Sequence, residues 1–175
     1  NLLKRLESSV NSFRLTLERI DDFIETSVNA IELFEQSHSG SQMIDVTEFS
    51  DDWDNEDSEN DPFVGRKSKI NLRDMDYTSW KRDLKHDLQA LQLLLLMLKD
   101  ITPEHDSKLQ QLMADLKQKF EAPINGNNKK VLIFTAFADT ANYLYEQLSG
   151  RILKECGLHV ALITGSTEGK CTLSK

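Results

Sequence analysis

The chain has 175 residues, a formal net charge of -8 and 39% apolar residues, enough for one ordinary domain or for a small domain with an extension. No apolar run reaches the roughly 20 residues that a membrane span requires, which excludes a membrane partner and favours a cytoplasmic location. Two cysteines and four histidines without ligand spacing exclude a zinc site, and we expect both thiols to be free.

The acidity belongs to a single segment. Residues 45–61 contain nine carboxylates and no Lys or Arg, whereas residues 62–175 hold 17 Lys and Arg against 13 Asp and Glu. The negative net charge therefore does not argue against a nucleic-acid partner for the rest of the chain.

Residues 1–36 carry a seven-residue apolar repeat, which predicts one long helix of roughly 50 Å that buries a narrow seam against other helices. The two core positions of the repeat are taken by Leu3, Val10, Leu17, Ile24 and Ile31, and by Leu6, Phe13, Ile20, Ser27 and Phe34.

Residues 37–69 lose this pattern, and their dense like charge predicts a flexible loop. The alternative is an arm in which Phe49 and Trp53 dock into a groove, which would make the segment self-inhibitory or partner-binding.

Two further helices are predicted over residues 76–100 and 103–120, the second capped by Thr102 and begun by Pro103. The first becomes apolar all round near its end, so we expect its far side, including Leu93 and Leu96, to be enclosed by protein. With the long first helix, this pair predicts an antiparallel helical bundle, here residues 1–121.

Residues 122–128 are a linker by composition, and residues 129–175 predict a different architecture. Val131–Phe134 has the continuous apolar run of a strand covered on both faces. A helix capped by Asp139 or Thr140 follows to Cys156, Gly157 ends it, and residues 159–164 form a second strand. The predicted fold class is therefore mainly α with a small α/β part: a helical bundle followed by a βαβ unit with a short parallel sheet.

The stretch Gly165–Thr172 partly matches a phosphate-binding P-loop. Its glycines are three residues apart instead of four, Cys171 stands where a Mg²⁺-binding Ser or Thr belongs, and too few residues follow for the required helix. An ordinary turn is the preferred interpretation. No other catalytic set can be assembled from local spacing, so no catalytic residue is predicted.

The segment "KKVLIFTAFADTANYLYEQL" at 129–148 resembles the opening of the second RecA-like lobe of superfamily-2 helicases, especially their Swi/Snf-like bacterial branch. "HVALITGST" at 159–167 resembles the next strand and its loop. The stretches "LLKRLESSVNSFRLTLERI" and "DMDYTSWKRDLKHDLQALQLLLLMLKDITPEHDSKLQQL" resemble the helical insertion that precedes this lobe. The resemblance covers most of the chain outside the acidic segment.

The resemblance implies a fragment of an ATP-dependent helicase or translocase: a helical insertion and a truncated RecA-like lobe. A Walker A sequence, an acid box and an arginine-finger motif are missing. The chain alone is thus expected to need no cofactor and hydrolyse no ATP, whereas ATP and Mg²⁺ are expected for the parent enzyme. The expected partners are the remaining helicase lobes in cis and nucleic acid, with DNA favoured.

In that family the second lobe grips the nucleic-acid backbone from loops at the carboxyl ends of its strands, where N–H groups and helix dipoles face phosphate. The positions that match here are Thr135, Phe137, Gly165, Ser166 and Thr167. Thr135 and Thr167 are predicted hydroxyl donors to phosphate. Phe137 either stacks on a base or closes over the core of the lobe, the latter being preferred.

Basic side chains on the helices are candidates for peripheral DNA contacts, although a solvated face is the preferred interpretation. They are Arg5, Arg14, Arg19, Lys81, Arg82 and Lys85. Two other functions stay open: a non-catalytic helical protein-interaction module, and a small P-loop-like nucleotide-binding protein. Exposed strand edges also predict self-association of the chain.

Overall fold

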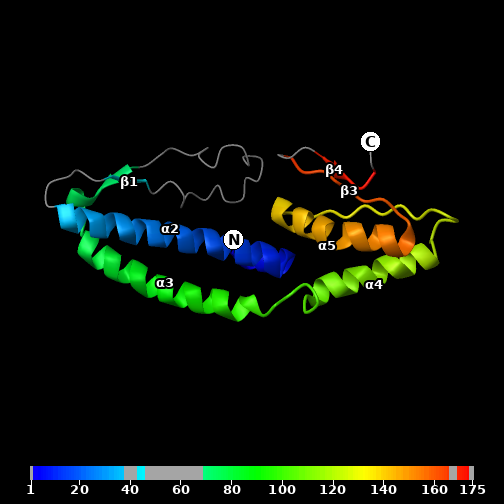
Figure 1. The fold of residues 1–175 in the computed structure, drawn as a ribbon, viewed down its shortest axis with the longest axis horizontal. Coiled ribbons are helices and arrows are strands. Elements are labelled where there is room, and N and C mark those ends of the chain that lie inside the picture. Colours follow the sequence, from blue (N-terminus) through cyan, green and yellow to red (C-terminus); the bar gives the residue numbers. More distant parts are fainter. Residues whose placement is uncertain (1, 38–42, 46–68, 166–168, 174–175) are drawn as a thin grey trace. The chain divides into compact units, whose positions relative to one another are not determined.

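The computed structural model describes residues 2–37, 43–45, 69–165 and 169–173. The described chain is mainly helical, as predicted, with short antiparallel strand pairs (Figure 1). It divides into two compact units, Arg14–Leu98 and Asn1–Phe13 together with Lys99–Lys175. The sequence had suggested a boundary at residues 122–128, but the third long helix belongs with the C-terminal part instead of with the first two.

The predicted first helix is present, with one interruption. It consists of α1 (Leu2–Ser8) and α2 (Val10–Ser37). Ser9 separates them and caps α2, because its hydroxyl oxygen accepts a 3.0 Å hydrogen bond from the amide of Ser12. The predicted apolar seam holds in α2, where Leu17, Ile24 and Ile31 are buried, but fails in α1, where Leu3 and Leu6 are exposed.

Helix α3 (Tyr77–Lys99) agrees with the prediction to within one residue at each end, and it packs antiparallel to α2 in the Arg14–Leu98 unit. Its start is capped by Asp76, whose carboxylate accepts from the amide of Ser79 at 3.0 Å; this bond is the main cause of the lowered pKa of Asp76. The core of the unit consists of Phe23, Ile24, Val28, Ile31, Leu72 and Leu84.

The far side of α3 was predicted to be enclosed, and this prediction is wrong. Leu93, Leu94, Leu96 and Met97 are all exposed. The α2–α3 pair covers a single face of α3, and no described element covers the opposite one.

Two short strands lie inside the segment that was predicted to be a loop. Strand β1 (Met43–Asp45) pairs antiparallel with β2 (Lys69–Asn71), with Ile44 opposite Ile70, and the 3-10 helix η4 (Leu72–Asp74) follows. Three-residue strands joined across more than twenty residues carry no local periodicity, so the sequence could not signal them. The predicted flexible loop and the arm bearing Phe49 and Trp53 otherwise lie outside the described residues.

Helix α4 (Ser107–Glu121) begins four residues later than predicted. Thr102 instead begins a separate turn, since its carbonyl accepts hydrogen bonds from the amides of His105 and Asp106. Asp106 is the actual cap. The apolar spacing of this helix predicts one inward face, and Leu109, Met113, Leu116 and Phe120 on that face are buried.

Helix α5 (Ala138–Cys156) packs on α4, and together they form the core of the second unit. Its end is as predicted: Gly157 adopts φ 65°, a left-handed conformation that costs glycine little. Its start differs, because Asp139 and Thr140 lie inside the first turn while Phe137 occupies the cap position without a side-chain hydrogen bond.

The predicted parallel sheet is not formed. Residues 129–137 adopt no strand pairing, and β3 (Ala161–Leu162) pairs antiparallel with β4 (Lys170–Cys171) instead. Pairing with a hairpin partner only eight residues away loses less chain entropy than pairing with a parallel partner across a helix, because the loop to be closed is shorter. The predicted strand 131–134 therefore has no partner among the described residues.

Candidate functional site

The beginning of α5 is held against α1 by a buried arginine. Arg5 is only 4% exposed, and its Nη1 lies 3.2 Å from Oδ2 of Asp139. The guanidinium also stacks over the ring of Phe137, with its central carbon 4.7 Å from the ring centroid. Arg5 thus neutralises the carboxylate in the first turn of α5 and covers the aromatic ring before it.

Three hydroxyl groups join the same two helices beside the arginine. Oγ of Ser8 and Oγ of Ser9 lie 2.8 Å and 3.1 Å from Oγ1 of Thr140. Ser9 and Thr140 are buried. Because buried hydroxyl groups must be hydrogen-bonded, this cluster fixes the rotation of α5 relative to α1.

A second polar connection lies between α4 and α5. The buried carboxylate of Asp106 accepts from the amide of Leu109 at 3.1 Å and from the hydroxyl of Tyr143 at 3.0 Å. One side chain therefore both caps α4 and binds α5.

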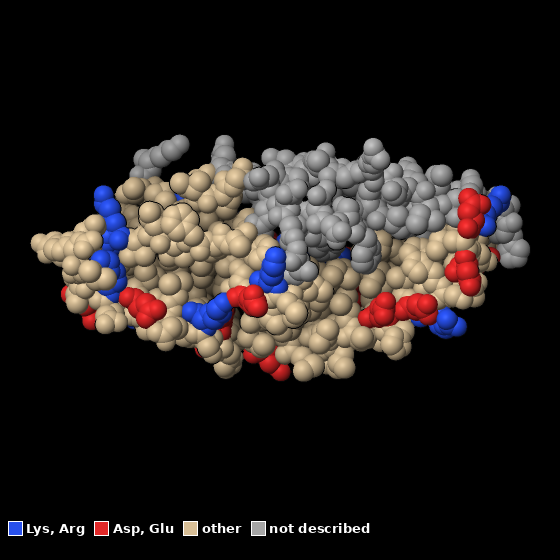
Figure 2. All heavy atoms as spheres, turned by 180° about the vertical axis from the view of Figure 1, so that it is seen from behind, with Lys and Arg blue, Asp and Glu red and all other residues tan. Residues whose placement is uncertain are grey.

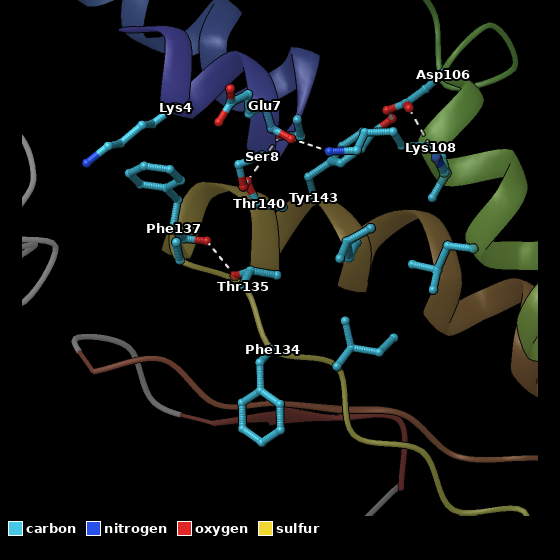
Figure 3. A pocket seen from close by; sticks show the side chains of 16 residues that line it. Lys4, Glu7, Ser8, Asp106, Lys108, Phe134, Thr135, Phe137, Thr140 and Tyr143 are labelled. Carbon is cyan, nitrogen blue, oxygen red and sulfur yellow. Dashed lines mark hydrogen bonds between the residues drawn. The ribbon is translucent and has the colours of Figure 1, made fainter. Parts of the chain in front are cut away.

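These contacts surround a cavity of about 600 Å³ within the Lys99–Lys175 and Asn1–Phe13 unit (Figure 3). Its apolar lining includes Leu109, Leu112 and Leu144, and Lys4 and Lys108 contribute positive charge. The Lys108 ammonium donates to the backbone carbonyl of Glu7. Thr135 and Phe134 line the cavity from the extended segment that leads into α5.

The start of α5 has the features of an anion-facing helix end. Phe137 at its cap position makes no side-chain cap hydrogen bond, and the positive end of the helix dipole lies there. Thr135 is two residues before the cap position, and its hydroxyl donates to the carbonyl of Phe137 at 2.8 Å. Thr135, which was predicted to donate a hydrogen bond to phosphate, thus lies beside the start of α5. Its hydroxyl proton is already donated to a carbonyl group of the protein.

The other residues that were predicted to contact the nucleic-acid backbone differ in their surroundings. Phe137 is buried under Arg5, in agreement with the preferred interpretation of a ring that closes the core, so it does not present its face to a base. Gly165 is exposed, in a bend after β3. Ser166 and Thr167 lie outside the described residues.

Most of the basic residues that were predicted as peripheral DNA contacts instead form ion pairs with carboxylates of this chain. Lys81 donates to Glu35 at 2.5 Å and Lys85 to Glu32 at 2.6 Å, and the second bond is the main cause of the lowered pKa of Glu32. These two lysines therefore connect α3 to α2.

The remaining peripheral candidates differ in exposure. Arg14 lies 3.8 Å from Glu18 one turn along α2. Arg82 is exposed and pairs with its neighbour Asp83 at 3.2 Å, and Arg19 is exposed on α2. Arg5, in contrast, is buried, and its guanidinium is directed at Asp139 instead of at solvent.

The visible face in Figure 2 shows Lys and Arg interspersed with Asp and Glu, with no continuous basic stripe over the part of that face that the structure describes. A broad electrostatic track for duplex DNA is therefore not apparent there.

Comparison with known proteins gives no relatives. No protein-family model, no curated protein and no solved structure matches this chain. Function must be argued from the residues themselves.

Within the described ranges, no group of three or more His, Cys, Asp or Glu side chains is placed to hold a metal ion. None of the described helices combines the length and the apolar character needed to cross a membrane. Cys156 and Cys171 are free, as predicted.

The polar network at the start of α5 was missed by sequence reasoning. Arg5 was predicted as a candidate DNA contact, Asp139 and Thr140 were predicted only as alternative caps of α5, and Ser9 was given no role. A signal was present in that Ser8, Ser9 and Ser12 stand at the spacing of one helix face, beside the apolar repeat. Thr140, the partner of Ser8 and Ser9, is 132 and 131 residues away from them, so only the tertiary structure identifies it.

Proposed function

We propose that this chain belongs to an ATP-dependent nucleic-acid helicase or translocase, in which residues 129–175 contribute to the second motor lobe and the preceding helices form its insertion. The observation that carries the proposal is the extended segment 129–137, which leads directly into α5 and ends at a helix start without a side-chain cap. The proposal also rests on the resemblance of "KKVLIFTAFADTANYL" to the opening of such a lobe.

The charges near α5 support a role for its start in binding phosphate. An acidic residue in the first turn would repel an anion, but Arg5 neutralises Asp139. A phosphate oxygen could replace the Phe137 carbonyl as acceptor of the Thr135 hydroxyl, at the positive end of the helix dipole. Lys4 lies on the same cavity and adds positive charge. DNA is the favoured track.

The described part of the P-loop-like stretch does not fit a phosphate-binding loop. Lys170, which would be the P-loop lysine, lies in β4 and not at a helix start. The small nucleotide-binding alternative is therefore not proposed. ATP would be bound by other parts of the enzyme, which we place in the cytoplasm.

The proposal is tested on the polypeptide encoded by the complete reading frame that contains this chain. We expect it to hydrolyse ATP faster when DNA is added. Thr135→Ala should raise the DNA concentration that gives half-maximal stimulation about fivefold, because one phosphate hydrogen bond contributes about 1 kcal/mol.

Thr78→Ala, an exposed hydroxyl at the start of α3, is the matched control and should leave this concentration unchanged. A polypeptide without ATPase activity, with or without DNA, contradicts the motor function. An unchanged response of Thr135→Ala in an active enzyme removes only this residue from the track.

A second function is favoured by the exposed apolar face on the C-terminal half of α3. Leu93, Leu94, Leu96 and Met97 lie together there, and contiguous apolar surface of this kind marks protein-binding sites. The chain would then act as a helical interaction module without needing DNA.

This alternative predicts that the immobilised chain retains specific proteins. The immobilised double variant, with Leu93→Asp and Met97→Asp, should not retain them. Replacement of the exposed Asp87 on the same helix by Lys changes charge without touching the apolar face, so it should retain them. Retention of the same proteins by the double variant would contradict a role for this face.

A further inference from the structure

The segment 131–137 has the exposure pattern of a β-strand although it belongs to no sheet. Its odd positions are the less exposed ones: Val131 and Ile133 are 40% and 44% exposed, and Phe137 is buried. Its even positions turn outward, with Leu132 and Phe134 84% and 89% exposed. In Figure 3, Phe134 points away from the cluster around Thr140. Alternation with a period of two is the signature of a strand with one covered face.

The backbone of this segment also resembles an unpaired edge. Lys130 donates its amide to the side chain of Asn128 at 3.0 Å, which fixes the beginning of the segment. Between Val131 and Phe134, no backbone hydrogen bond to another described residue is formed. Four consecutive residues thus offer donors, acceptors and two large apolar side chains to a further strand.

We propose that a second copy of this chain pairs with residues 130–134 as an antiparallel strand, with a two-fold axis at Leu132. In this register Leu132 faces its own copy and Val131 faces Ile133. Lys130 faces Phe134, which places an ammonium group beside an exposed aromatic ring. The surface is self-complementary, as a two-fold interface requires.

The charges at the beginning of the segment decide between the two strand directions. In a parallel pair in register, Lys129 and Lys130 would each lie beside the same lysine of the partner, which is destabilising. In the antiparallel pair the lysines of the two copies lie at opposite ends of the ribbon. Avoidance of like-charge repulsion therefore favours a closed antiparallel dimer over an open parallel stack.

This interface does not depend on the proposed motor function, since it rests on the exposure and charge of residues 129–134 alone. Its test is the mass of the 175-residue chain in solution, measured by sedimentation equilibrium from about 10 to about 500 μM. We expect the mass to rise from 20.0 kDa toward twice that value. A monomer throughout this range overturns the proposal.

Variants at the axis make the test specific. Leu132→Asp places two carboxylates opposite each other and should weaken association about tenfold or more, and Leu132→Lys should act likewise. An equimolar mixture of the two variants should associate again, because opposite charges then meet at the axis. Failure of the mixture to associate, when each variant is folded by circular dichroism, contradicts the register.

The exposed apolar face of α3 provides the matched control. Met97→Asp changes an equally exposed apolar side chain away from the segment and should leave the dimer intact. If Met97→Asp abolishes the dimer and Leu132→Asp still dimerises, the interface lies on α3 and the proposal is overturned.

Strand direction is tested by cross-linking two separately prepared copies that lack Cys156 and Cys171. One copy carries Lys130→Cys and the other Phe134→Cys. These positions oppose each other in the antiparallel register and lie roughly 13 Å apart in a parallel pair in register, beyond disulfide reach. A mixed disulfide supports the antiparallel dimer, and its absence under oxidising conditions in which the dimer forms contradicts it.

Discussion

Replacing Asp106 by Ala is expected to destabilise the protein by about 3 kcal/mol. The carboxylate is buried and satisfies two donors at once, the amide of Leu109 and the hydroxyl of Tyr143. Loss of the helix cap accounts for about 1 kcal/mol, and loss of the buried hydrogen bond from the Tyr143 hydroxyl to the carboxylate accounts for about 2 kcal/mol. The measurement is the free energy of unfolding in guanidinium chloride, followed by circular dichroism.

Two conservative variants separate these contributions. Asp106→Asn keeps an oxygen acceptor for the amide of Leu109, and Tyr143→Phe removes the hydroxyl together with its need for a partner, so each should cost less than Asp106→Ala. Hydrogen exchange at the Leu109 amide should accelerate in Asp106→Ala and not in Tyr143→Phe.

Asp115 is a suitable control because it is an exposed carboxylate on the same helix. Asp115→Ala should change the free energy of unfolding by at most about 0.5 kcal/mol. A cost for Asp106→Ala no larger than this would show that the buried network does not hold α4 to α5.

The second large effect is expected at Arg5. Arg5→Ala should cost about 2–4 kcal/mol, because it leaves the largely buried carboxylate of Asp139 without its cation and removes the group stacked on Phe137. Arg5→Lys should recover part of this loss, since it restores the charge but not the planar group that contacts carboxylate and ring together. Chemical denaturation again gives the free energy.

A double-mutant cycle with Asp139→Ala isolates the pair. The double variant should be more stable than the sum of the two single changes predicts, because the second change removes the carboxylate whose ion pair with Arg5 the first change broke. Arg82→Ala, which removes an exposed arginine, is the control and should be nearly neutral. Strict additivity of Arg5→Ala and Asp139→Ala would contradict direct coupling.

The helices were predictable because their signals are local. The end of α5 follows from Gly157, and the extent of α3 follows from an unbroken run of helix-forming residues between Asp76 and Asp100. Apolar spacing also identified the buried face of α4. Such features depend on residues three or four positions apart, which interact in any helix whatever surrounds it.

Strand pairing was not predictable to the same degree. The apolar run 131–134 was taken for a strand covered on both faces, but a strand needs a partner, and the sequence does not say where that partner lies. The pairing of β3 with β4 and of β1 with β2 instead depends on which segments meet in space. The period-two exposure of 131–137 shows that the local preference was identified correctly and only the pairing was not.

By itself, the sequence determined the mainly helical class, the bounds of the long helices to within a few residues, and the candidate position of Thr135 before α5. The tertiary structure alone decided that Arg5 is buried against Asp139, that Phe137 is closed off, and that α4 packs with α5. The reason is that burial of a charged or aromatic side chain depends on partners up to 134 residues away. A local sequence pattern does not show which distant residues become these partners.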